Sequence, residues 1–398
     1  MEAIHCTIIN LCNLYQDHPT MTKDKGSDVY NFLQKQKHLT GLPRFWNMLS
    51  SLRLMIVLNL DGDVKSICNE ALTVCESLIS TIKSTSLTGK DAFDVGNDIF
   101  NLMSTLRLAK YSPTILTLLL LAGDLHKQID DPTEKVKLME RYADECYDFV
   151  SRYNKNLQRT TYRHVISRMT DFIQSIQSVK VDDEKLEATS KSQCWLAIAE
   201  CHRYLGEYSR AIEVLQLAIA TLESTFGDGC RKMWLYSLCC HCIGCDYHYN
   251  NQPEEAETFF IKSFHAYQEV EDESEEWKME AIHCTIINLY NLYQKHPTMT
   301  KEKGSNVYNF LQKQKHLTGL PRFWNMLLCL RLMILLNLDG DVKSICNELV
   351  TMATNISPPA DHPNRLCTGL RATAELLFSK NDDESAKSLL ECVDKFEK

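Results

Sequence analysis

The stretch SQCWLAIAECHRYLGEYSRAIEVLQLAIATLES, residues 192–224, decides the fold class. Apolar residues recur at helical spacing in its first half, around Trp195, and again in its second half, around Leu215. Between the two halves lies YLGEYSR, in which Gly206 stands where a helix is expected to end. The stretch therefore predicts two helices joined by a short turn, which together form a helical hairpin.

The order of large and small residues in this hairpin resembles a tetratricopeptide repeat (TPR). That family places a large residue at position 4, small residues at positions 8, 20 and 27, and a turn near position 15. The matching residues here are Trp195, Ala199, Gly206, Ala211 and Ala218. We expect Ala199 and Ala211 to let the two helices approach closely, and Trp195 to fill the gap to the next hairpin.

Two later stretches repeat the pattern. LCCHCIGCDYHYNNQPEEAETFFIKSF places Gly244 and Ala256 at small positions, and GLRATAELLFSKNDDESAKSLLECV places Ala374 and Ala386 there. From Ala211 to Ala256 the distance is 45 residues, longer than the family's period, which predicts longer helices or loops. The resemblance implies an all-α fold, a right-handed α-solenoid of about nine helical hairpins, with the first helix of each hairpin on the concave wall.

A second kind of repetition overlies the hairpins. Residues 1–70 and 279–348 agree at 63 of 70 positions, at a uniform offset of 278. The identity covers loops as faithfully as core positions, and it stops within an expected helix. A recent duplication explains this better than a binding motif used twice.

The chain is expected to divide into four segments. Duplicated hairpins in their first copy take residues 1–83, irregular hairpins 84–183, the clearest TPR hairpins 184–275, and the second copy with a C-terminal hairpin 276–398.

Composition limits the classes of partner. The chain has 398 residues and a net charge of −9 without a basic stripe, so nucleic acid is not an expected direct ligand. Its most apolar run, ILTLLLLAG at 115–123, is shorter than a membrane span, and the N-terminus has no basic segment before its apolar part.

The 17 cysteines are scattered and odd in number, which indicates free thiols. We expect an intracellular protein, cytoplasmic or nuclear, with no membrane contact.

The cluster CCHCIGCDYH, residues 239–248, raises the alternative of a zinc site. A closed zinc site needs four ligands that converge on one ion, and a continuous helix does not easily supply them. Core thiols and groove-facing histidines are the expected interpretation, with no metal and no cofactor. The chain also lacks the P-loop, H-E-x-x-H and G-x-S-x-G motifs, so no catalytic residue is predicted.

The resemblance also implies which positions face a partner, namely positions 5, 9, 12 and 13 of each first helix. The residues expected to bind a partner are Glu200, Arg203, Tyr204, His241, His248 and Tyr249. Some family members hold a peptide's terminal carboxylate with Lys at position 5 and Asn at position 9. Leu196 and Glu200 depart from that pair, as do His241 and Cys245, so that mode is not expected here.

The leading hypothesis is therefore a non-catalytic scaffold that binds a segment of another protein along a concave helical surface. Two alternatives stay open. The long, irregular repeats are similar in style to the helical arms of separase and the cohesin loader, which would make the chain a regulatory arm in chromosome cohesion or cell division. The cysteine–histidine cluster leaves a zinc-binding module as the other.

Overall fold

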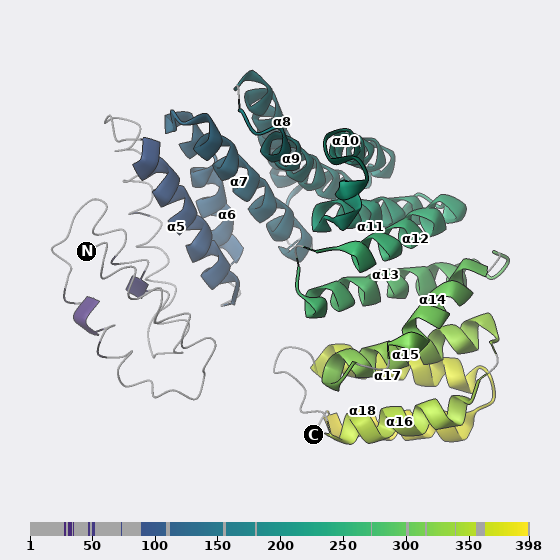
Figure 1. Ribbon diagram of the computed structural model, residues 1–398. Helices are drawn as coiled ribbons and strands as arrows, with labels where there is room; N and C mark the ends of the chain where they lie inside the picture. The colour runs from purple at the N-terminus through teal and green to yellow at the C-terminus, as the bar shows by residue number, and fades with distance from the viewer. Residues whose placement is uncertain are drawn as a thin grey trace. The chain divides into compact units, whose positions relative to one another are not determined.

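The structure is a computed structural model of the chain. It describes residues 28, 31–33, 35, 47, 50–51, 73, 89–108, 112–153, 157–179, 181–271, 273–299, 302–314, 317–338, 340–355 and 363–396. Most of the predicted segment 1–83 lies outside these residues. Every regular element in the described ranges is helical, which confirms the all-α fold class (Figure 1). The chain divides into two compact units, Met1–Glu207 and Tyr208–Lys398.

The first unit is a stack of helices that pack on their neighbours in the chain (Figure 1). They are α5 (Gly89–Leu108), α6 (Ser112–Ala122), the 3-10 turn η1 (Leu125–Gln128), α7 (Pro132–Tyr153), α8 (Arg159–Ser178) and α9 (Glu184–Leu205). Helix α9 packs against both α7 and α8. Buried rings join the helices, since Tyr142 lies 6.3 Å from Phe100 and 5.2 Å from Phe172 between ring centroids.

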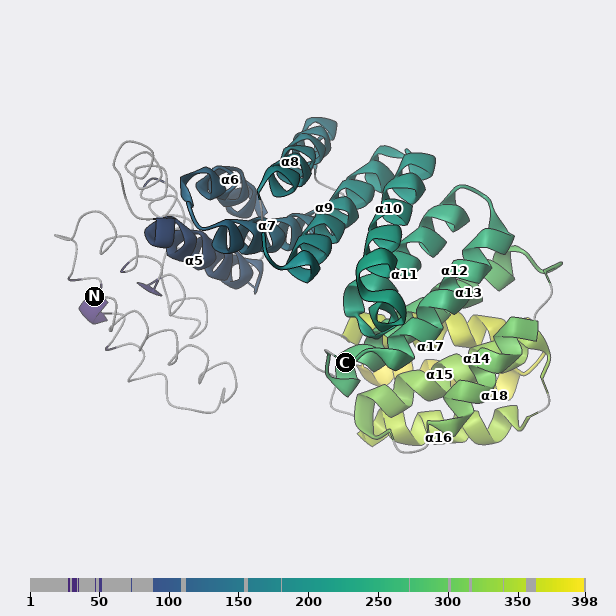
Figure 2. The ribbon, with the colours of Figure 1, turned by 45° about the horizontal axis from the view of Figure 1, so that its top comes forward.

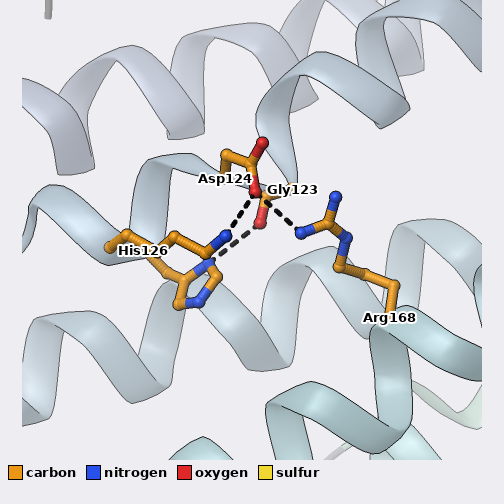
Figure 3. A network of polar contacts seen from close by, with 5 residues as sticks. Gly123, Asp124, His126 and Arg168 are labelled. Atoms are coloured by element: carbon orange, nitrogen blue, oxygen red, sulfur yellow. Dashed lines mark hydrogen bonds and ion pairs between the residues drawn. The ribbon is translucent and has the colours of Figure 1, made fainter. Parts of the chain in front are cut away.

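A polar network fixes the turn between α6 and α7 (Figure 3). Asp124 accepts hydrogen bonds from Lys127 at 3.0 Å and from Arg168 of α8 at 2.7 Å, while Nδ1 of His126 lies 2.9 Å from the main-chain oxygen of Gly123. Burial opposes the charge of Asp124, but the bonds from Lys127 and Arg168 outweigh it and hold the pKa of that carboxyl well below its usual range. The network therefore ties α8 to the turn that precedes α7.

The second unit contains the remaining helices (Figures 1 and 2). They are α10 (Tyr208–Phe226), the 3-10 turn η3 (Gly227–Lys232), α11 (Trp234–Tyr249), α12 (Pro253–Glu269), α13 (Glu275–Lys295), α14 (Glu302–Lys313), α15 (Gly319–Leu336), α16 (Val342–Asn355), α17 (Pro363–Phe378) and α18 (Asp383–Phe396). From α10 to α13 each helix packs on the next, and beyond them α13 packs on α15, α15 on α17 and α16 on α18. One hydrophobic core runs through α12 to α18.

Small residues set the distance between α11 and α12, as the TPR pattern predicts. A Cβ atom on Gly244 would lie only 2.6 Å from Cδ1 of Phe260, so only glycine fits at this crossing. Ala256, the next small position, is fully buried. Ala374 and Ala386 are also fully buried in the later pair of packed helices, α17 and α18. These contacts confirm TPR-like hairpins in the second unit.

Residues 192–224 form the predicted helices and turn. Helix α9 begins after Asp183, whose carboxylate accepts from two main-chain N–H groups, and ends at Gly206 in the left-handed region, φ 80°. Helix α10 follows at Tyr208. Ala199 and Ala211 are fully buried. Because α9 and α10 belong to different units, their packing as one hairpin stays a prediction, and so do the handedness and number of hairpins and the four segments.

In the second duplicated copy, the sequence TGLP at 318–321 resembles a loop, but α15 begins within it, at Gly319. Pro321 is accommodated because the first turn of a helix does not require its N–H. Trp324 packs against the core. The identity between the copies ends at Glu348, inside α16, which confirms that the copied block ignores a helix boundary.

Candidate partner-binding surface

In the first unit, Glu200 links two helices. It is buried, with an exposed fraction of 3%, and its carboxylate accepts from the Ser151 hydroxyl of α7 at 2.9 Å. The second carboxylate oxygen pairs with Arg203, one turn further along α9. The structure therefore places Glu200 in the packed interface between α7 and α9, where it orients Arg203.

Tyr204 lies near the end of α9 in the same unit. Its side chain is 38% exposed, and its ring stacks on Tyr162 of α8 with 6.0 Å between centroids and 20° between planes. The contact holds the ring in one orientation although much of it faces solvent. Tyr204 is thus an exposed aromatic side chain that is already fixed in place.

The second unit repeats this arrangement with Tyr249. That residue is 59% exposed and stacks on Tyr208 of α10, with 5.6 Å between centroids and 23° between planes. In each pair, a tyrosine near the start of one helix contacts a tyrosine near the end of the next helix. The pairs span 42 and 41 residues of sequence, close to the repeat length. Sequence reasoning missed Tyr162 and Tyr208, and this common spacing is the signal that could have found them.

Histidines extend the second pair across α11 to α13. The ring of His248 lies 5.8 Å from that of Tyr249 and 6.4 Å from that of His296, the residue that ends α13, at an interplanar angle of 87°. Tyr208, Tyr249, His248 and His296 therefore form a row of four rings, called the ring row below. Nδ1 of His248 and Nε2 of His296 are buried without a hydrogen-bond partner in the described part of the chain.

The charge state of His248 follows from its surroundings. Burial lowers the pKa of this imidazole, and electrostatic interactions with the neighbouring Lys295 and His296 side chains lower it further. His248 is therefore neutral in neutral solution. Lys295 itself is exposed and forms no ion pair with the residues that the structure describes.

His241 serves the packing of α11 on α13. Its Nδ1 lies 2.9 Å from the hydroxyl of Thr285 and its Nε2 lies 3.3 Å from the amide nitrogen of Asn288. That amide also donates to the sulfur of Cys245 at 3.5 Å. His241 and Cys245, at repeat positions 5 and 9 of α11, therefore contact side chains of α13. His248 and Tyr249, at positions 12 and 13, belong to the ring row.

The cysteines of α11 lie in its core-facing side. Cys239, Cys240 and Cys242 are buried free thiols. Burial raises the pKa of Cys239 well above its usual value and that of Cys240 to about 12, so both thiols stay protonated at neutral pH. Within the described ranges, no group of three or more His, Cys, Asp or Glu side chains is placed to hold a metal ion. None of the described helices is long and apolar enough to cross a membrane.

The chain is similar to several solved structures at low sequence identity. No protein-family model matches it, and neither does any curated protein. Similar solved structures include the apo form of RapI, at 10% identity over 99% of this chain and 97% of that chain, with a TM-score of 0.47. A signal-transduction ATPase with a tetratricopeptide repeat sensor from Pyrococcus horikoshii matches at 12% identity over 92% of this chain and 55% of that chain, TM-score 0.46. A putative kinesin light chain from Podospora anserina with TPR-like repeats matches at 14% identity over 68% and 97%, TM-score 0.38.

Proposed function

We propose that this chain is a non-catalytic protein-interaction scaffold that binds a segment of a partner protein on the ring row of its second unit. The observation that carries the proposal is Tyr249, which is 59% exposed yet stacked on Tyr208. An exposed aromatic side chain that is already held in place loses little conformational entropy when a partner packs on it. Tyrosine also offers apolar area together with a polar hydroxyl, which suits a binding surface.

The first unit supports a second, smaller contact of the same kind. Tyr204 is exposed and stacked on Tyr162, and Arg203 stands beside it in the chain, oriented by buried Glu200. Aromatic and arginine side chains are the types that most often dominate binding energy at protein interfaces. The proposed contact residues are therefore Arg203, Tyr204, His248 and Tyr249, while Glu200 and His241 act as positioning residues.

Protonated core thiols argue against a thiolate nucleophile in α11. Burial raises the pKa values of Cys239 and Cys240, whereas nucleophilic catalysis by cysteine needs a lowered pKa.

The alternative function, a helical arm within a larger cohesion complex, would use the same exposed surface. Capture of a cohesin subunit would favour that alternative over a free-standing scaffold.

Affinity capture from cells with the full chain tests the proposal. Tyr249→Ala should remove a defined set of co-purified proteins, and Tyr204→Ala should weaken the same set or remove another. Phe378→Ala is the matched control, because Phe378 is also an exposed aromatic residue, 37% exposed, but lies on α17. The proposal is wrong if all three variants capture the same proteins in the same amounts as the unchanged chain.

A further inference from the structure

The spacing of the ring row suits an extended chain. Successive centroids along Tyr208, Tyr249, His248 and His296 are 5.6, 5.8 and 6.4 Å apart. Alternate residues of an extended strand are about 6.6 Å apart, because the strand rises about 3.3 Å per residue. The steps between neighbouring rings are therefore close to the spacing of alternate side chains along an extended segment.

The α13 end of the row is positively charged. Lys295 is exposed beside His296, and its ammonium group is one of the neighbours that lower the pKa of His248. Elsewhere in the unit, exposed lysines such as Lys232 and Lys343 are paired with glutamates, at 2.7 and 2.9 Å. Lys295 thus offers a positive charge that no described carboxylate neutralises.

Comparison of the two duplicated copies shows that this positive charge is specific to the second copy. Lys295 corresponds to Asp17 of the first copy, whereas the residues on both sides, NLYQ before it and HPTMTK after it, are identical in the two copies. Only seven positions differ between the copies, and at this one the charge is reversed. The second copy alone places a cation next to the histidine of its HPT sequence.

From these observations we infer that the ring row takes an extended, acidic segment of a partner protein, with carboxylate side chains at the end formed by Lys295 and His296. The inference rests on the function proposed above and names the chemistry of the partner. Because the whole chain carries a net charge of −9, its overall charge disfavours an acidic segment, and the local cation gives such a segment a preferred place to bind.

Fluorescence anisotropy with short labelled peptides tests the inference on the full chain. The probe is a peptide in which Glu alternates with Val, compared with counterparts that carry Gln or Lys in place of Glu. The Glu peptide should bind tightest and the Lys peptide weakest. Lys295→Asp, which installs the residue of the first copy, should weaken binding of the Glu peptide by roughly threefold to tenfold and leave the Gln peptide unchanged.

Two further variants separate charge from the ring row. Lys387→Asp is the matched control, because Lys387 is exposed on α18 and the substitution changes the net charge equally, so it should leave the affinity for the Glu peptide within about twofold. Tyr249→Ala should weaken binding of the Glu and Gln peptides alike. Far-ultraviolet circular dichroism of each variant establishes that the helices are intact.

The outcomes distinguish the two proposals. If Tyr249→Ala weakens binding but the Glu and Gln peptides bind equally well, or Lys295→Asp has no more effect than Lys387→Asp, the acidic partner is wrong and the ring row still binds protein. If the Glu peptide binds but Tyr249→Ala leaves its affinity unchanged, the row is not the binding surface and both proposals fail. If the Glu peptide does not bind, or the Lys peptide binds tightest, the acidic partner is again wrong.

Discussion

The side-chain amide of Asn325 donates a hydrogen bond to the main-chain oxygen of Leu311 over 2.9 Å. Asn47 makes the same bond to Leu33 over 3.0 Å in the first duplicated copy, at the same offset of 278 residues. Both asparagines are buried. The Leu311 carbonyl lies in the last turn of α14, where it also accepts a bond from the main-chain N–H of Gln314 at 3.1 Å, so the asparagine amide is its second donor. This polar contact is a shared structural property of the two copies.

Removal of this contact should cost stability. In Asn325→Ala the Leu311 carbonyl keeps the bond from the main-chain N–H of Gln314 but loses the bond from the asparagine amide, so the free energy of unfolding of the second unit should fall by about 0.5–1.5 kcal/mol. Urea unfolding followed by circular dichroism measures the loss. Asn309→Ala, an exposed asparagine on α14, should change stability by less than about 0.5 kcal/mol. Equal losses in the two variants would show that the buried bond contributes nothing of its own.

Gly244 should tolerate no side chain. In Gly244→Ala the new methyl group would meet the buried ring of Phe260 at 2.6 Å, and α11 and α12 would have to separate. Overpacking of this kind costs about 1–3 kcal/mol. Gly229→Ala is the control, because a Cβ there meets nothing within 4 Å. Thermal unfolding should show a lower melting temperature for Gly244→Ala alone, and a melting temperature equal to that of the unchanged chain would contradict the close crossing.

The copies should differ in stability at Tyr290. This buried residue lies beneath the guanidinium of Arg331, 4.2 Å from the ring centroid, whereas the first copy has Cys12 at the equivalent position. Tyr290→Cys removes the ring and the cation–π contact, so it should destabilise the second unit by about 2–4 kcal/mol in urea unfolding.

An exposed difference between the copies provides the control for Tyr290. Asn306→Asp also installs a first-copy residue, but on the surface of α14, and it should be close to neutral. If the two substitutions have the same effect, the contact between Tyr290 and Arg331 does not stabilise the unit.

Acid should destabilise both units through buried histidines. Burial lowers the pKa of His126 in the first unit and of His283 in the second to about 4, from 6.5. The unfolded chain therefore takes up these protons first, so stability falls as the pH drops from 6.5 toward about 4. Each histidine contributes on the order of 3 kcal/mol over that window, since one pKa unit corresponds to about 1.4 kcal/mol.

The measurement is urea unfolding at about pH 7 and about pH 5. His283→Gln should reduce the loss of stability between the two pH values, because glutamine takes up no proton there. His265→Gln, at an exposed position of α12, should leave the loss unchanged. A pH dependence that is the same in all three proteins would refute the role of His283.

Much of the helical architecture could be predicted because it depends on local rules. Gly206 ends α9 since glycine adopts the left-handed conformation without strain, and Gly244 marks a crossing that no side chain fits. The start of α15 at Gly319 is harder to read from the sequence, because the loop-like sequence TGLP also suits the first turn of a helix.

The candidate surface could be predicted only in part. Tyr204 and Tyr249 were chosen by their repeat positions, and both are exposed. Their stacking partners, Tyr162 and Tyr208, stand about one repeat earlier, and a position within one helix does not reveal them. Buried Glu200 was chosen by the same rule, yet it faces another helix, because a pattern gives the side of a helix and not what covers it.

The sequence by itself determined the helices, the close crossings and the duplicated block, since helical periodicity and small residues act over a few turns of chain. Only the tertiary structure decided which polar side chains form hydrogen bonds between packed helices and which aromatic rings stay exposed. His241 and His248 are seven residues apart on one helix. The first is held between α11 and α13 by Thr285 and Asn288, and the second joins the ring row. The difference arises because the neighbouring helix α13 presents different side chains to each of them.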